Sequence, residues 1–270
     1  NCLIVLTAER SEEVVTVILH GIEEDGSLLT PEELEEATYT FLDAEGNETL
    51  LDPGDASAKL LDASDGDLFT MSLVTDYSDS MRLEDLTLIS ELYTDLVTDL
   101  PEVYEAEVLA FSTNVSVQQS FTEDRDDLRA GVGLDLMLFR GWTALNDAMG
   151  QAVTDLAERD RPVRIMVVAT DGEENASSHW WPEQVLEAIE EEQVLVVMIG
   201  ALFADVDQLE RMAGERGIYF YGTEYEGVAE DVQAWIESLS SSVKVELEGA
   251  PPDATSVRIE VGGMETTAKL

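Results

Sequence analysis

Apolar residues in the central part of the chain follow two different periods. A continuous apolar run, typical of a buried strand, lies at 69–75, and further strands rich in apolar residues are expected at 105–113, 163–170, 194–201 and 218–223. Between these runs apolar residues recur every three or four positions, which predicts helices at about 83–100, 145–156, 182–191, 206–213 and 228–239. A shorter strand is expected at 115–121. Strands that alternate with helices indicate an α/β fold, here a doubly wound, mostly parallel six-stranded sheet.

The two ends of the chain carry a strand pattern without long helices. The run at 14–22 predicts a strand, and the AEGN sequence at 44–47 predicts a hairpin turn. A strand pattern returns after residue 242, in a segment too short to fold alone. We therefore expect residues 1–66 and 242–270 to form a small β-sandwich into which the α/β domain, residues 67–241, is inserted. The alternative is a disordered or edge segment at the C-terminal end.

The charge of the chain is extreme. It has 59 acidic and 14 basic residues, a formal net charge of −45 at pH 7. Nucleic acid is therefore not an expected partner, because phosphate binding needs Lys and Arg, and anionic membranes are disfavoured for the same reason. The carboxylates are spread along the whole chain, which favours a halophilic surface suited to high salt over many weak calcium sites.

The single cysteine, Cys2, excludes an internal disulfide. A cysteine beside the first residue is similar to the lipid-attachment cysteine of bacterial lipoproteins; the alternative is that LIVLT is simply a first strand. No stretch approaches the apolar length of a membrane span. We expect an extracytoplasmic protein, on the cell surface or in the periplasm, with a possible lipid anchor at Cys2.

Side chains with oxygen atoms cluster where three predicted elements meet. The sequence DYSDSM follows an apolar strand and places Asp76, Ser78 and Ser80 at a spacing of two residues. GWTALNDAM contributes Thr143 at the start of a helix, and VVATDGEEN contributes Asp171 after another strand. In doubly wound sheets ligands bind at the carboxyl ends of strands. Two carboxylates and three hydroxyls suit a hard divalent cation, namely Mg²⁺, Mn²⁺ or Ca²⁺.

These three motifs together resemble the metal-ion-dependent adhesion site of von Willebrand factor type A (vWA) domains, over about residues 68–240. The resemblance implies a Rossmann-like fold and a cation that binds directly or through water to Asp76, Ser78, Ser80, Thr143 and Asp171. It also implies binding of a protein that presents an Asp or Glu to the metal. A second cation site near Glu84 and Asp85 is the less favoured alternative, because carboxylates also stabilise a helix N-terminus.

Two other function classes remain open from the sequence. The domain could be an assembly or co-chaperone subunit that works with an ATPase or maturation machinery. A metal-dependent hydrolase is least favoured, because it needs a general base near the reacting water and neither His20 nor His179 belongs to a recognisable catalytic set. We therefore expect a binding protein and not an enzyme.

Several aromatic residues lie in the loops beside the three motifs. Trp and Tyr are favoured anchors in protein interfaces. We expect a partner-binding rim formed by Tyr77, Trp142, His179, Trp180 and Trp181. The alternative is local packing, above all for Trp181, which precedes a proline at a helix start.

Overall fold

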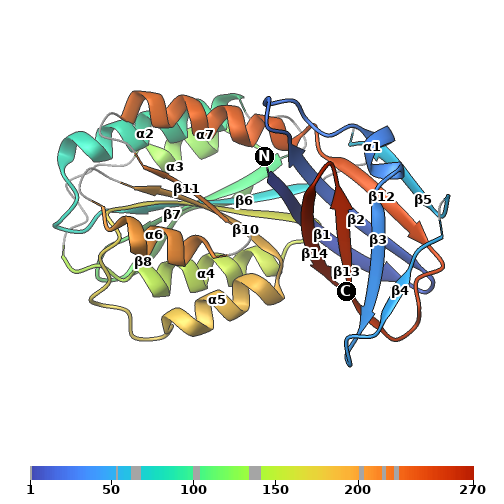
Figure 1. Cartoon of the computed structure of the whole chain (residues 1–270). Coiled ribbons are helices and arrows are strands. Elements are labelled where there is room, and N and C mark those ends of the chain that lie inside the picture. The colour runs from blue at the N-terminus through green and yellow to red at the C-terminus, as the bar shows by residue number, and fades with distance from the viewer. Residues whose placement is uncertain are drawn as a thin grey trace. The chain divides into compact units, whose positions relative to one another are not determined.

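The computed structural model describes residues 2–52, 54–61, 68–99, 104–133, 141–200, 204–214, 217–221 and 225–270 (Figure 1). The chain divides into two compact units. One comprises residues 1–66 and 238–270, and the other comprises residues 67–237. The boundary predicted at residues 66 and 67 lies outside the described residues.

The larger unit is built on a six-stranded sheet in the order β11-β10-β9-β6-β7-β8. The strands are β6 (Phe69–Asp76), β7 (Tyr104–Phe111), β8 (Val115–Thr122), β9 (Val163–Thr170), β10 (Val194–Gly200) and β11 (Ile218–Tyr221). Every neighbouring pair is parallel except β7 and β8. The strands β6 and β7 are buried along their whole length, and β9 is buried except at Arg164, because helices cover both faces of the sheet. The predicted doubly wound α/β fold is confirmed.

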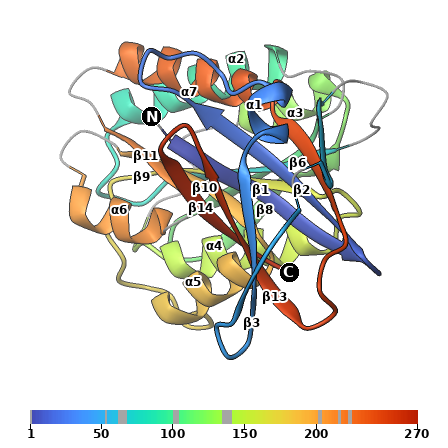
Figure 2. The same ribbon diagram turned by 45° about the vertical axis from the view of Figure 1, so that its right-hand side comes forward.

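Helices form a layer on each face of this sheet (Figures 1 and 2). One layer contains α2 (Leu83–Asp99), α3 (Arg125–Val132) and α7 (Tyr225–Leu239), and the other contains α4 (Leu145–Ala157), α5 (Pro182–Glu191) and α6 (Val206–Ala213). The helix α3 was not predicted. Its few apolar residues give no clear period, and its start is fixed by Asp124, whose side chain accepts hydrogen bonds from the amides of Asp126 and Asp127.

The smaller unit contains two four-stranded antiparallel sheets. The first is ordered β1 (Cys2–Ser11), β2 (Val14–Ile22), β12 (Val243–Glu248), β5 (Ala56–Leu60), and the second β14 (Met264–Lys269), β13 (Ala254–Val261), β3 (Thr38–Asp43), β4 (Glu48–Leu50). Strands from the C-terminal end thus pair with strands from the N-terminal end. Val17, Phe41, Val245 and Ile259 belong to one shared core, which makes the unit a β-sandwich.

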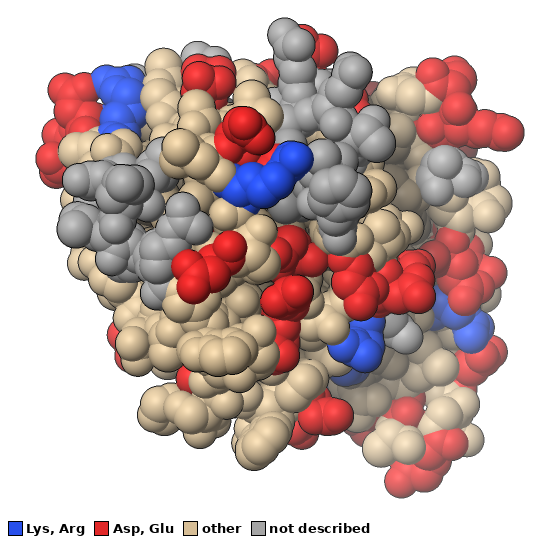
Figure 3. All heavy atoms as spheres, turned by 90° about the vertical axis from the view of Figure 1, so that its left-hand side faces the viewer, with Lys and Arg blue, Asp and Glu red and all other residues tan. Residues whose placement is uncertain are grey.

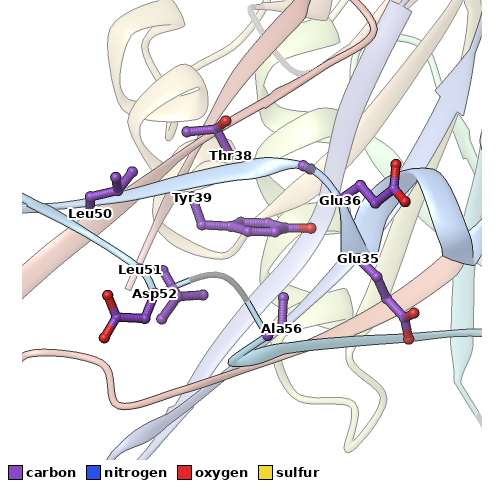
Figure 4. Close-up of a pocket in the computed structure, with 10 residues that line it drawn as sticks. Glu35, Glu36, Thr38, Tyr39, Leu50, Leu51, Asp52 and Ala56 are labelled. Carbon is purple, nitrogen blue, oxygen red and sulfur yellow. The ribbon is translucent and has the colours of Figure 1, made fainter.

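A cavity of about 450 Å³ opens in the β-sandwich beside the short helix α1 (Pro31–Glu35) (Figure 4). The ring of Tyr39 and the side chain of Leu51 supply apolar surface, and Glu35 and Asp52 supply carboxylates. The Tyr39 hydroxyl donates to the carbonyl oxygen of Leu34 at 2.6 Å, so its proton is already used inside the fold. The described lining contains no basic side chain, which makes the cavity unsuited to an anion.

Among the helices of the described ranges, none combines the length and the apolar character that crossing a membrane requires.

Candidate metal centre and its rim

The predicted metal ligands lie at the carboxyl edge of the six-stranded sheet. Asp76 is the last residue of β6, and Asp171 directly follows β9. Because β6 and β9 are parallel neighbours, their ends reach the same edge of the sheet. Thr143 lies two residues before the start of α4, the helix that packs on both strands.

Asp76 is fully buried and held by both of its carboxylate oxygens. Oδ1 accepts a hydrogen bond from the amide of Ser78 at 2.8 Å, and Oδ2 accepts one from the hydroxyl of Thr170 at 2.7 Å. Burial raises the pKa of Asp76 to about 6, although these hydrogen bonds oppose the rise, and the nearby charge of Asp171 raises it further. A cation bound at this edge would therefore compensate a carboxylate that is costly to leave charged.

The two serines of the DYSDSM motif face each other. The Oγ atoms of Ser78 and Ser80 are 2.9 Å apart; Ser78 is buried and Ser80 is exposed. The amide of Asp79 donates to the carbonyl oxygen of Gly141 at 3.0 Å. This bond fastens the motif to the loop that carries Thr143.

Thr143 is buried, and its backbone joins the second loop to the third. Its amide donates to the Asn175 side-chain oxygen at 2.8 Å, and its carbonyl oxygen accepts hydrogen bonds from the amides of Asn175 and Ala176. The next residue, Ala144, donates its amide to the carbonyl oxygen of Ser112 at 2.8 Å, beyond the end of β7. The three predicted motifs are thus connected to one another at one edge of the sheet.

The donor chemistry of this edge fits a hard cation. The predicted ligands Asp76, Ser78, Ser80, Thr143 and Asp171 all carry side-chain oxygen atoms, and hard cations prefer oxygen ligands. In the part of the chain that the structure describes, no group of three or more His, Cys, Asp or Glu residues is arranged to hold a metal.

A comparison with protein families assigns this architecture. The model of the von Willebrand factor type A domain matches residues 71–235, more than half of the chain. The chain belongs to the von Willebrand factor type A family. Among curated protein sequences, none matches it.

Solved structures share the fold of this vWA domain at low identity. BatB, a conserved hypothetical protein from Bacteroides thetaiotaomicron, is 17% identical with a TM-score of 0.56, over 64% of this chain and 98% of BatB. An aerotolerance-related membrane protein from Bacteroides fragilis NCTC 9343 is 17% identical with a TM-score of 0.52, over 63% and 98%. Proximal thread matrix protein 1 from the mussel byssus, with a zinc-occupied MIDAS motif, is 18% identical with a TM-score of 0.57, over 70% and 49%.

The predicted rim of the vWA domain divides into exposed and packed residues. Trp142 and Trp181 are 66% and 67% exposed, and the side chain of His179 is 81% exposed. Trp180 is half-buried and packs on the core formed by α4, α5 and β9, with its ring against Gly150.

Tyr77 does not belong to an exposed rim, and the expectation for this residue was wrong. It is buried, with 4% of its surface exposed, and its amide donates to the carbonyl oxygen of Phe111 at 2.7 Å. This bond extends the pairing of β6 with β7 by one residue. Tyr77 therefore still behaves as a strand residue, and its ring packs inside the vWA domain.

Two carboxylates that sequence reasoning missed hold the third loop of the vWA domain. Asp147, in the first turn of α4, accepts hydrogen bonds from the amides of Ser178, His179 and Trp180 at 2.8–2.9 Å. Burial alone would raise the pKa of Asp147, but these hydrogen bonds outweigh it and keep the pKa below its usual value. An acidic residue in a first helical turn is a visible signal, but its partners more than 30 residues away are not.

Glu174 makes a second attachment between the same loop and the start of α4. Its carboxylate accepts hydrogen bonds from the amide of Asn146 at 2.8 Å, from the amide of Ala176 and from the amide and hydroxyl of Ser177.

The structure gives Asp85, one of the two carboxylates considered for a second cation site, a partner within the protein. Asp85 forms a two-pronged ion pair with Arg82, at 2.6 and 2.8 Å.

Proposed function

We propose that this vWA domain is a divalent-cation-dependent protein-binding module. Mg²⁺, or alternatively Mn²⁺ or Ca²⁺, would be held by Asp76, Ser78, Ser80, Thr143 and Asp171, and an Asp or Glu of the partner would complete its coordination. The observation that most supports this proposal is the buried carboxylate of Asp76, fixed by Ser78 and Thr170 directly beside the paired serine hydroxyls.

The acidity of the chain explains why such binding would depend on a metal. With a net charge of −45, the surface repels a carboxylate that approaches without a cation. Hydroxyl ligands are neutral, so a cation bound partly by them keeps positive charge for an external carboxylate. The zinc-occupied site of the mussel protein, which has a similar fold, also supports a metal at this position.

The site does not favour hydrolysis. Ser178, His179 and Asp147 are the residue types of a nucleophilic triad, but the Ser178 hydroxyl and the Asp147 carboxylate both contact Nδ1 of His179, at 3.0 and 3.2 Å. A triad needs the acid on one ring nitrogen and the nucleophile on the other. This arrangement therefore serves to fix the loop.

The second candidate function is that of an assembly subunit. The proteins of similar fold bear on where this protein is located. Two proteins of similar fold are described as BatB and as an aerotolerance-related membrane protein. They support an extracytoplasmic location, at the cell surface or in the periplasm. A lipid anchor at Cys2, the first residue of β1, stays a prediction.

The metal proposal is tested by calorimetric titration of the whole chain with MgCl₂ and MnCl₂. Asp76→Asn removes the buried charge while keeping an oxygen that can accept the Ser78 amide, and we expect it to weaken metal binding by at least about tenfold. Asp124→Asn is the matched control, because Asp124 caps α3 and asparagine caps helices equally well. Equal affinity of wild type and Asp76→Asn, with both folded by circular dichroism, would contradict the proposal.

A further inference from the structure

We propose that Trp142, His179 and Trp181 form an aromatic shelf beside the metal edge. We further propose that this shelf selects partner segments in which the acidic residue is flanked by apolar side chains. This inference rests on the proposed function and adds to it the chemistry of the partner.

The side chains of the aromatic shelf are exposed although they are large and partly apolar. Trp142 and Trp181 each leave about two thirds of their surface in water, and His179 leaves 81% of its side chain. Burying such apolar surface against a partner is favourable, at roughly 25 cal/mol per Å². Tryptophan is also the residue type most enriched among energetically dominant interface contacts.

The aromatic shelf is held in place by bonds that do not involve a partner. Asp147 accepts the amides of His179 and Trp180, and the ring of Trp180 lies against Gly150 on α4. The amide of Trp181 donates to the Gln184 side chain at 3.0 Å. A surface that is already ordered loses little conformational entropy when a partner binds, so more of the contact energy becomes affinity.

The amide of Trp142 donates to the Thr113 hydroxyl at 3.0 Å. The preceding Gly141 has a φ of +132°, and a Cβ at that position would collide with the same hydroxyl. The position of Trp142 is therefore fixed by its own loop and by the end of β7.

The segments that carry the aromatic shelf lack Asp, Glu, Lys and Arg, which indicates what kind of partner it fits. Residues 141–146 and 175–182 contain no Asp, Glu, Lys or Arg, in a chain with 59 acidic residues. Figure 3, which looks onto the side of the molecule shown at the left of Figure 1, shows carboxylates scattered over this face with uncharged surface between them. A basic partner segment would find no ion pairs on these residues, whereas an apolar segment would avoid the surrounding carboxylates.

The aromatic shelf is connected to the metal edge at both of its ends. Trp142 directly precedes Thr143 in the chain. The segment that carries His179 and Trp181 begins with Asn175 and Ala176, whose amides bond the Thr143 carbonyl oxygen at 2.9 and 3.0 Å. The two loops that carry the shelf are therefore both attached to Thr143, one of the proposed metal ligands.

The test uses fluorescein-labelled pentapeptides, measured by fluorescence anisotropy with the whole chain in excess MgCl₂. The probes are Gly-Phe-Asp-Leu-Gly, Gly-Ser-Asp-Ser-Gly and Gly-Phe-Asn-Leu-Gly. We expect the Phe-Asp-Leu peptide to bind at least about tenfold more tightly than the Ser-Asp-Ser peptide. Trp142→Ala and Trp181→Ala should each remove most of this preference, and the corresponding Phe variants should keep part of it. The control Tyr219→Ala alters another aromatic residue, 40% exposed at the edge strand β11, and should leave the preference unchanged.

The outcomes separate this inference from the proposed function. Equal or undetectable binding of the two Asp peptides overturns the aromatic shelf, as does an apolar preference that survives both alanine variants. If binding requires Mg²⁺ and Asp but ignores the flanking residues, only the shelf is overturned and the metal-dependent function stands. If the apolar preference depends on the tryptophans but persists with chelator and with the Asn peptide, the shelf stands and the metal-dependent function fails.

Discussion

Glu107 is a buried acid that the proposed function does not use, and its protonation should control the stability of the vWA domain. It lies in the middle of β7 with 2% of its surface exposed, beside Ser72 of β6. In the described part of the structure, its Oε1 atom has no hydrogen-bond partner. Burial raises the pKa of Glu107 to about 8, and the charge of Asp155 on α4 adds to the rise.

The direction of the pH effect follows from how strongly Glu107 binds its proton in the folded and in the unfolded chain. Glutamate in the unfolded chain has a pKa near 4.5, so above that pH unfolding releases the proton that the folded protein holds. Folded stability is therefore fully present below about pH 4.5 and is lost as the pH rises to about 8. The slope approaches about 1.4 kcal/mol per pH unit, which gives a total on the order of 5 kcal/mol.

Glu107→Gln replaces the acid with a neutral side chain of the same shape and removes this loss. We expect the variant to be slightly less stable than wild type at pH 4.5 and more stable at pH 8, by a few kcal/mol. The assay compares melting temperatures by circular dichroism across this range at constant salt. The other carboxylates repel one another in both proteins, so the difference between the two curves isolates Glu107.

Glu105→Gln is the matched control on the same strand and the same sheet face. Burial would raise the pKa of Glu105, but hydrogen bonds from Arg159 and the charge of Arg161 outweigh it and lower the pKa. Removing this charge takes the carboxylate away from the half-exposed Arg159 and the buried Arg161, so the control should be destabilised at neutral pH. Parallel curves for wild type and Glu107→Gln, or a Glu107 carboxyl that titrates near pH 4.5 in carbon-13 NMR, would refute the reasoning.

Three further perturbations test other parts of the structure. Burial lowers the pKa of His20 to about 4, so wild type should lose melting temperature between pH 6.5 and 4, and His20→Gln should lose less over the same interval; equal losses would exclude this role. Gly150→Ala places a methyl group against the Trp180 ring and should cost about 1–3 kcal/mol of stability, measured by urea unfolding, whereas an unchanged midpoint would show that the ring moves freely. The melting temperature should rise from low to molar NaCl as carboxylate repulsion is screened, and a flat or falling trend would argue against a halophilic surface.

The fold could be predicted because its signals are local. An eight-residue apolar strand such as β6 and a helical stripe such as that of α4 each lie within one stretch of sequence. The pairing of the C-terminal strands with β2 and β3 could also be predicted. The C-terminal segment is too short to fold alone, so its strands need another sheet to join. The helix α3 escaped because acidic and basic residues dominate it and leave no apolar period.

The candidate site could be predicted only in part, because the hydrogen bonds that hold its loops join residues far apart in the sequence. The motif residues are visible in sequence, but the attachment of the third loop by Asp147 joins residues 31 to 33 positions apart. Tyr77 looked like a loop aromatic, yet one more backbone bond to Phe111 keeps it in the strand layer and buries it. Whether an aromatic residue near a loop is exposed can depend on a single backbone contact of this kind. The local sequence pattern does not reveal such a contact.

Three buried acids on one face of the sheet show most clearly what could not be predicted from the sequence, namely which group compensates each acid. Asp76, Glu105 and Glu107 all lie in apolar strands, and the parallel register places them on the face covered by α4. Arg159 and Arg161 reach Glu105 and lower its pKa, whereas burial raises the pKa of Glu107 by more than Ser72 and Arg159 lower it. For Asp76 we propose a cation, since hydroxyls surround it. A buried acid in a strand therefore predicts that some compensation exists, and only the neighbouring elements decide whether it is a guanidinium, a proton or a metal.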